Sequence, residues 1–222
     1  VRPAEDESAN RLAAESLVAR SVDSIVVCTQ QERDDLGRLY DVATERVDVV
    51  PAGVDLSLFQ PMDMIEARQS LGLTESKIIL SVGRIEPLKG IDILIKALAQ
   101  LHDVSDTRLL IVGGELGSDP EIKRLMELAS SLGVIGSVTF TGVVEQTELP
   151  KYYSAADVFV MSSYYESFGL AALEAMACGT PIVASGASGG PKSFLKEGKT
   201  GYLIAWPHPE AYAERLQQIL MD

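Results

Sequence analysis

From about residue 77 onward, short runs of β-branched residues alternate with longer segments whose apolar residues recur at helical spacing. This alternation is typical of βαβ units, in which helices join parallel strands. The runs that fit strands are Ile78–Val82, Arg108–Val112, Val138–Thr141, Val158–Met161, Ile182–Ala184 and Tyr202–Ile204. The segments that fit helices are Ile91–Leu101, Glu121–Leu132, Leu149–Ala155, Leu170–Ala177 and Pro191–Leu195. Right-handed crossovers between such strands predict an α/β fold with a doubly wound, Rossmann-like parallel sheet.

The first sixty residues follow a different pattern. The elements expected there are an amphipathic helix at Ala9–Ala19, a strand at Ser24–Cys28, a helix at Glu32–Tyr40 and a strand at Val47–Val50. Because four elements are too few for an independent core, we expect residues 1–60 to be the tail of a preceding domain and a connector. A helical pattern at Glu210–Met221 runs to the end of the sequence. We therefore expect a fragment cut at both ends, with residues 61–222 forming a C-terminal domain that is truncated at its own C-terminus.

Composition narrows the classes of partner. Hydrophobic residues make up 46% and charged residues 23% of the chain, as in ordinary globular proteins. The net charge of −13 argues against a nucleic-acid partner, since phosphate-backbone binding needs a basic surface. Cys28 and Cys178 have no neighbours at metal-ligand spacing, so we predict buried thiols and no metal site. The absence of an apolar run of about 18–20 residues predicts a cytoplasmic protein and leaves peripheral membrane contact open.

The strongest candidate site is the segment Glu166-Ser-Phe-Gly-Leu-Ala-Ala-Leu-Glu174. It follows the strand that ends at Met161, and we expect its helix to begin near Phe168 or Gly169. In open α/β sheets, ligands bind beyond the carboxyl ends of the strands, where helix N-termini attract anions. The backbone amides of Phe168, Gly169 and Leu170 are therefore expected to point at a diphosphate.

The two glutamates of this segment suit a ligand with vicinal hydroxyls. Glu166 lies in the loop and Glu174 lies two turns into the helix, so the first can face a sugar and the second a ribose. The alternative interpretation makes both of them solvated residues, at a helix N-terminus and on an exposed helix face. The tyrosine pairs at 152–153 and 164–165 are more typical of core or rim packing, and we assign them no role.

A second candidate site follows the strand Ile78–Val82. It contains Gly83, Arg84 and Lys89 in a turn that opens the next helix near Ile91. Arg84, as a planar fork, and Lys89, as a point charge, could both reach one diphosphate. The alternative is an ordinary turn in which these cations pair with the acidic residues at positions 86 and 92.

Together these stretches resemble the family 4 glycosyltransferases, which have the two-domain GT-B fold. The family's C-terminal domain carries a Gly-Arg…Lys-Gly turn and a segment with two spaced glutamates. The resemblance also covers Pro51-Ala-Gly-Val-Asp55 as an interdomain connector, Phe140-Thr-Gly142 as a nucleoside loop and Ala155-Ala-Asp157 as the approach to the glutamate segment. It extends over nearly the whole chain.

This resemblance implies a role for each candidate residue. Arg84 and Lys89, beside Gly83, would bind the donor diphosphate, Glu174 the ribose and Glu166 the hydroxyls of the donor sugar. The amides near Phe168, Gly169 and Leu170 would meet the phosphates or the sugar, and Gly142 and Val143 would lie along the base. Arg84, Lys89 and Glu166 are the predicted catalytic residues. The family retains the anomeric configuration, either by front-face attack assisted by the leaving phosphate or, alternatively, with Glu166 as a nucleophile.

The implied function is transfer of a hexose from a UDP or GDP sugar to an acceptor hydroxyl that stays unknown, with no cofactor. The run Gly189-Gly190-Pro191-Lys192 is similar to sucrose-phosphate synthases, although Pro191 in the first turn of a helix explains it equally well. Two alternatives remain. The chain could be a nucleotide-sugar-binding module that is inactive without its acceptor domain, or a nucleotide-sugar 2-epimerase of the same fold.

Overall fold

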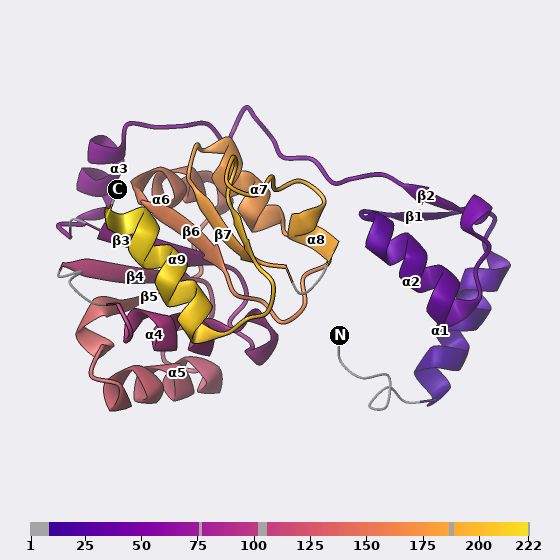
Figure 1. Cartoon of the computed structure of the whole chain (residues 1–222), viewed down its shortest axis with the longest axis horizontal. Helices are drawn as coiled ribbons and strands as arrows, with labels where there is room; N and C mark the ends of the chain where they lie inside the picture. Colours follow the sequence, from indigo (N-terminus) through magenta and orange to yellow (C-terminus); the bar gives the residue numbers. More distant parts are fainter. Residues whose placement is uncertain (1–8, 76, 102–105, 187–188, 222) are drawn as a thin grey trace.

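A central sheet of six parallel strands organises most of the chain. The computed structural model describes residues 9–75, 77–101, 106–186 and 189–221. The sheet has the order β5-β4-β3-β6-β7-β8 (Figure 1). Its strands are β3 (Lys77–Val82), β4 (Thr107–Val112), β5 (Val138–Gly142), β6 (Val158–Met161), β7 (Ile182–Ser185) and β8 (Tyr202–Ile204). The predicted α/β fold with a doubly wound sheet is therefore confirmed.

The winding direction of the sheet reverses between β3 and β6. The chain first moves outward from β3 through β4 to β5, then returns to pair β6 with the free side of β3. The β3–β4 ladder is long, whereas β3 and β6 pair only at Ile79–Val158 and Leu80–Phe159. Adjacent strands that lead away in opposite directions leave a crevice at their carboxyl ends. We therefore expect the candidate site at the carboxyl ends of β3 and β6.

Helices cover both faces of the sheet. On one face lie α4 (Ile91–Leu98), α5 (Pro120–Ser131) and α9 (Pro209–Met221), with α4 packed between the other two. On the other face lie α3 (Met64–Leu71), α6 (Leu149–Ala155) and α7 (Leu170–Ala177). A single-turn helix, α8 (Gly189–Lys192), lies between β7 and β8.

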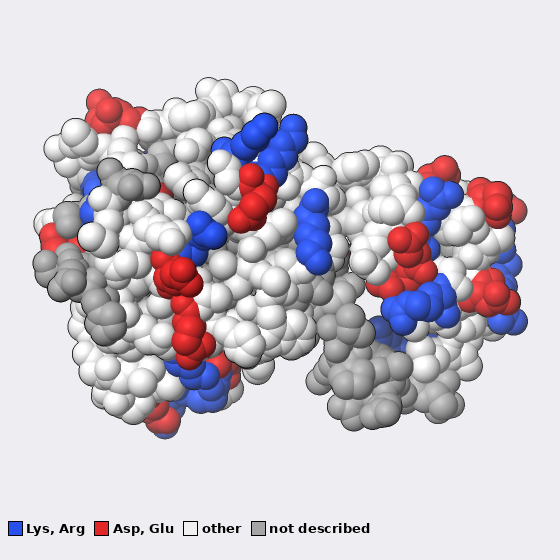
Figure 2. All heavy atoms as spheres, viewed as in Figure 1, with Lys and Arg blue, Asp and Glu red and all other residues white. Residues whose placement is uncertain are grey.

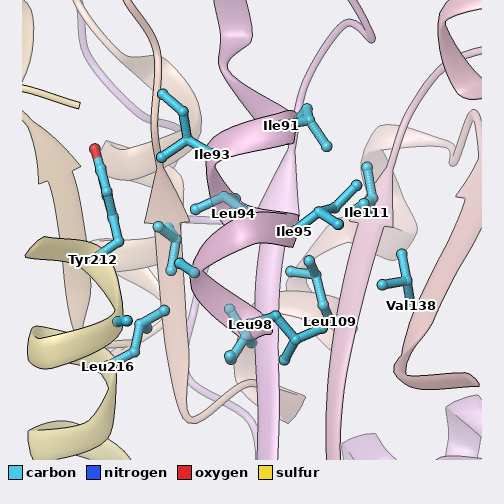
Figure 3. Close-up of a cluster of buried hydrophobic side chains, with 14 of the residues drawn as sticks. Ile91, Ile93, Leu94, Ile95, Leu98, Leu109, Ile111, Val138, Tyr212 and Leu216 are labelled. Atoms are coloured by element: carbon cyan, nitrogen blue, oxygen red, sulfur yellow. The ribbon is translucent and has the colours of Figure 1, made fainter. Parts of the chain in front are cut away.

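Helix α4 lies at the centre of the first face. Figure 3 shows its side chains Ile91, Ile95 and Leu98 beside the β4 residues Leu109 and Ile111. All five side chains are buried. Helix α4 contacts the sheet below it and a helix on each side, so little of its surface reaches water. We expected this helix to reach residue 101, but it ends at Leu98.

Residues 9–49 form a small unit with a sheet of its own, and helix α2 of this unit contacts α8. It consists of α1 (Ala9–Ser21), β1 (Ile25–Val27), α2 (Gln30–Tyr40) and β2 (Val47–Val49), and the two strands pair in parallel. Helix α2 begins two residues before its predicted start, because Thr29 and Glu32 form a capping box. The prediction that the first helix is amphipathic is wrong. Its Leu17 and Val18 are exposed, and its apolar residues do not gather on one face.

Most other predicted boundaries differ from the observed ones by one or two residues. The larger difference is the expected helix at 191–195, which is replaced by α8. Gly190 lies so close to the loop before α7 that an added Cβ would stand 2.7 Å from the carbonyl oxygen of Phe168. Short 3₁₀ helices, which the sequence did not predict, occur at Thr44–Arg46, Pro87–Lys89, Ile135–Ser137 and Gln146–Glu148.

Acidic and basic side chains are interspersed on the face of the molecule that Figure 2 shows. The expectation that no nucleic acid binds stays a prediction.

In the described parts of the chain, no helix has both the length and the apolarity needed to cross a bilayer.

Two isoleucine substitutions test this packing. Ile95 is fully buried, whereas Ile65 on α3 is 66% exposed. We expect Ile95→Ala to lower the free energy of unfolding by about 2–5 kcal/mol, because it leaves a cavity between α4 and the sheet. The same change at Ile65 should shift it by no more than about 0.5 kcal/mol. Urea unfolding measures both, and equal losses would contradict the described core.

Candidate active site at the reversal of the sheet

Two loops meet where the sheet reverses direction, one after β3 and one after β6. The Ser162 hydroxyl donates to the carbonyl oxygens of Gly90 at 2.7 Å and Lys89 at 3.1 Å. The backbone N–H of Tyr164 donates to the Leu88 carbonyl at 2.9 Å. Ser162 is buried, so these bonds are shielded from water. The β6–α7 loop is therefore docked on the β3–α4 loop.

Gly90 makes this close approach possible. Its φ of +63° is in the left-handed region, and a Cβ there would lie 2.3 Å from the Ser162 carbonyl oxygen. No residue with a side chain can satisfy both conditions without moving the partner loop.

The docking brings Lys89 and Glu166 together. The Lys89 Nζ lies 2.7 Å from the Glu166 Oε2, and the two side chains are only 21% and 16% exposed. The Ser163 hydroxyl lies 3.3 Å from the same carboxylate oxygen. A half-buried ion pair of this kind is held more firmly than a surface pair, because water and salt screen it less. The structure thus unites one residue from each predicted motif.

Arg84 is placed differently. Its side chain is 79% exposed and pairs with Glu86 at 3.0 Å, which is the ordinary turn contact considered as the alternative. For Lys89 that alternative is wrong, because Asp92 pairs with Lys96 instead, at 2.8 Å.

A cleft of about 240 Å³ opens beside the ion pair. Five predicted site residues line it: Gly83, Arg84, Lys89, Glu166 and Leu170. Its floor is formed by the carboxyl ends of β3, β4 and β6, which is where the sheet topology places a ligand. Gly142, Val143, Phe168, Gly169 and Glu174 do not line it.

Helix α7 spans Leu170–Ala177, as its apolar pattern predicted, so it begins one or two residues after Phe168 and Gly169, the other predicted starts. Gly169 precedes it in a left-handed conformation, with φ of +93°. Phe168 is buried and packs on Phe194, with ring centroids 5.6 Å apart, so its side chain anchors the loop from behind. The first amides of a helix have no acceptor within the helix, and those of α7 begin at the edge of the cleft.

Gly142 lies one strand further along the same sheet edge. Its carbonyl accepts a 2.8 Å hydrogen bond from the N–H of Gly113, and a Cβ on Gly113 would lie 1.9 Å from the Gly83 carbonyl oxygen. Gly83, Gly113 and Gly142 therefore make a closely packed glycine edge at the ends of β3, β4 and β5. Val143, the residue after Gly142, is 75% exposed. The sequence prediction missed Gly113, although a glycine pair directly after a predicted strand was a usable signal.

Glu174 is not the solvated residue of the alternative interpretation. Burial raises its pKa above the usual carboxyl value, while a hydrogen bond from the Tyr153 hydroxyl opposes that rise. The two oxygen atoms are 2.7 Å apart. Tyr153, to which the sequence prediction assigned no role, is fully buried. The contact joins residues on two different helices, so no local spacing could have revealed it.

Comparison with known proteins identifies the family. Residues 63–222 match the family model described as glycosyl transferases group 1. The chain belongs to this family. The predicted resemblance to GT-B glycosyltransferases is therefore confirmed.

Two curated relatives are D-inositol 3-phosphate glycosyltransferases by name. The chain is 41% identical to D-inositol 3-phosphate glycosyltransferase 2 of Catenulispora acidiphila, over 96% of the chain and 52% of that protein. It is 42% identical to the enzyme of the same name from Frankia alni, over 96% of the chain and 54% of that protein. The chain thus spans about half the length of these group 1 relatives.

Solved structures agree with the fold. Sucrose-phosphate synthase from Thermosynechococcus elongatus has a TM-score of 0.89 and 36% identity, with 98% of this chain and 54% of that chain covered. Anabaena Alr3699/HepE, solved in complex with UDP and glucose, has a TM-score of 0.87 and 26% identity, with 98% and 59% covered. The similarity to sucrose-phosphate synthase suggested by the Gly-Gly-Pro run is thus found at the level of structure. Residues 187 and 188, just before that run, lie outside the described residues.

The described residues contain no candidate metal centre. Across the ranges that the structure describes, no three His, Cys, Asp or Glu side chains gather as a metal site. The free thiol of Cys178 is buried, and burial raises its pKa to about 11. Cys28 is a free thiol that is partly buried rather than fully buried as predicted.

Two glycine substitutions test the loop docking. Gly90 and Gly72 have nearly the same backbone conformation, with φ of +63° and +66°, but only Gly90 faces another loop. We expect Gly72→Ala to cost about 1–2 kcal/mol of unfolding free energy, the ordinary penalty of a left-handed alanine. Gly90→Ala should cost about 1–3 kcal/mol more, because its Cβ meets the Ser162 carbonyl. Chemical denaturation measures the difference, and similar losses would show that the two loops do not depend on this contact.

Proposed function

We propose that the chain is the donor-binding half of a retaining glycosyltransferase, which transfers a hexose from a UDP or GDP sugar to an acceptor hydroxyl. Residues 61–222 are the donor domain, and residues 1–60 are the tail of an acceptor domain with its connector. The observation that carries the proposal is the half-buried Lys89–Glu166 pair at the mouth of the cleft. Family membership and the UDP complex of Alr3699/HepE support it.

The charges of the cleft suit a diphosphate. An ammonium group has three donors, so Lys89 can keep one contact with Glu166 and still donate to a phosphate oxygen. Arg84 can move toward the ligand at little cost, because an exposed ion pair such as Arg84–Glu86 contributes about 0–1 kcal/mol. The free amides at the start of α7 supply further donors to an anion. These groups offset the unfavourable field of a chain with net charge −13.

The remaining site residues divide the donor among them. Glu166 accepts hydrogen bonds from hydroxyls of the donor sugar, and Glu174, further along α7, accepts them from the ribose. Gly142 and the exposed Val143 lie along the base at the glycine edge. A cleft of about 240 Å³ is smaller than the roughly 300–1,000 Å³ of ordinary ligand sites, so it accommodates the diphosphate and sugar rather than the whole donor.

Transfer proceeds with retention of configuration by front-face attack. The acceptor oxygen bonds to the anomeric carbon as the bond to the leaving diphosphate breaks, and a phosphate oxygen takes the acceptor proton. Lys89 and Arg84 stabilise the negative charge that grows on the leaving group. The ion pair favours this route over a Glu166 nucleophile, because a carboxylate held by an ammonium at 2.7 Å is a weaker nucleophile than a free one.

A second candidate is a binding module that does not catalyse transfer by itself. One observation favours it: the chain spans about half the length of its curated relatives. The base and acceptor stay open, since the curated relatives and the solved structures carry different names. Nothing in the described site favours a 2-epimerase over a transferase.

Loss of either of two charged residues should weaken nucleotide binding. We expect Lys89→Ala and Glu174→Ala each to weaken UDP binding about ten- to 150-fold, because a charge-assisted hydrogen bond contributes about 1.5–3 kcal/mol. Lys199→Ala, which removes an exposed cation from the β-turn region before β8, is the control. Isothermal titration with UDP, GDP and ADP measures the affinities and identifies the base. Unchanged affinity in both variants would remove the proposed site.

Glu166 should discriminate between nucleotide and nucleotide sugar. Only the sugar reaches its carboxylate, so we expect Glu166→Ala to bind UDP as tightly as the unaltered chain, or more tightly as Lys89 is released. The same variant should lose affinity for UDP-hexose. Parallel titrations with UDP and UDP-glucose measure the two effects, and an equal loss for both ligands would place Glu166 at the diphosphate instead.

A further inference from the structure

Glu174 lies further along α7 than the residues that line the cleft. It lies four residues after Leu170, a cleft-lining residue, and residues at this spacing share one side of a helix. Its side chain is half-buried, so it has few directions available for a ligand. A carboxylate in that position binds vicinal hydroxyls well only if its oxygens are already oriented.

Tyr153 provides that orientation. Its hydroxyl lies 2.7 Å from Glu174 Oε2 and donates to it, which leaves Oε1 free for a ligand. An ionised carboxylate can only accept hydrogen bonds, so the hydroxyl proton of Tyr153 lies between the two oxygen atoms and points at Glu174.

The ring of Tyr153 is held on all sides. It makes edge contacts with Phe59 and Phe159, with ring centroids 6.1 Å and 5.8 Å away. The Thr180 hydroxyl donates to the Tyr153 carbonyl at 2.7 Å, which ties the end of α7 to α6. A fully buried ring with aromatic neighbours cannot swing, so its hydroxyl stays at one point in space. Phe59 belongs to the segment that leads from the predicted connector into α3.

We propose that Tyr153 is a positioning residue for nucleotide recognition: its hydroxyl orients Glu174 for the ribose hydroxyls. This inference rests on the proposed function, in which Glu174 holds the ribose. A packing residue would need no hydroxyl here, because a buried hydroxyl without a partner costs about 1–3 kcal/mol. The Tyr153 hydroxyl instead has a partner, the carboxylate of Glu174 on α7.

The same contact sets how binding depends on pH. The titratable groups placed against Glu174 are Tyr153 from α6 and Cys178, which directly follows α7. Burial raises the pKa of Glu174, and the hydrogen bond from Tyr153 lowers it. Removing the hydroxyl therefore raises the pKa further. With a higher pKa, the Glu174 carboxylate is protonated at a higher pH. As the pH falls, the variant would therefore lose nucleotide binding earlier than the unaltered chain.

The test compares ligands with and without ribose hydroxyls. The chain and its Tyr153→Phe variant are titrated with UDP and with 2′,3′-dideoxy-UDP. We expect the variant to bind UDP about three- to tenfold more weakly than the unaltered chain does. It should bind the dideoxy ligand as well as the unaltered chain does, because only UDP has ribose hydroxyls that can donate hydrogen bonds to Glu174. Tyr152→Phe is the matched control, since it removes the hydroxyl of the adjacent partly buried tyrosine, and it should change neither affinity.

Each outcome decides a separate question. Equal UDP affinity in Tyr153→Phe and the unaltered chain overturns the positioning role, and so does an equal loss for both ligands, which reports general structural damage. An unaltered chain that binds UDP and dideoxy-UDP alike overturns the ribose assignment of Glu174, whereas no binding of UDP at all overturns the proposed function.

Two further measurements exclude a purely structural effect. In the Glu174→Ala background, adding Tyr153→Phe should cause no further loss of UDP affinity, because its only target is gone. The acidic limb of UDP affinity should move to higher pH in Tyr153→Phe alone. An additive second loss, or an unmoved limb, contradicts the proposal.

Discussion

The site depends on one tight contact, the approach of the Gly90 backbone to the Ser162 carbonyl. Glycine permits both the left-handed conformation and the absence of a Cβ that this contact requires. The Ser162 hydroxyl then satisfies the carbonyls of Lys89 and Gly90, so the contact closes without an unpaired buried acceptor. The contact makes one surface of two loops, and it brings together Lys89 and Glu166, which are 77 residues apart in sequence.

Burial changes what the charged residues can do. Lys89 and Glu166 share a half-buried position, so their attraction is screened less than that of the exposed Arg84–Glu86 pair. The first pair is held in place at the cleft, whereas the second is open to water. Although the chain is acidic overall, the field inside the cleft is set by the nearest, least screened groups.

Glu174 is linked to the segment before α3 through aromatic packing. Phe59 packs on Tyr153, whose hydroxyl reaches Glu174, so a residue of that segment helps to hold a carboxylate on α7. Burial makes this arrangement specific, because the Tyr153 ring lies between Phe59 and Phe159 and has little room to move. The chain of contacts is short and continuous within the C-terminal unit.

The sequence alone determined the strand–helix alternation, the doubly wound sheet and the two loops that carry charge, because hydrophobic periodicity and loop composition are local properties. It also identified the family through motifs within single segments. Only the tertiary structure decided that Lys89 pairs with Glu166 while Arg84 stays at the surface, and that Tyr153 directs Glu174. It also decided that α8 replaces the expected longer helix, and that α1 lacks an apolar face. These features depend on which distant backbones meet and how deeply they bury a side chain, and no spacing along one segment reports that.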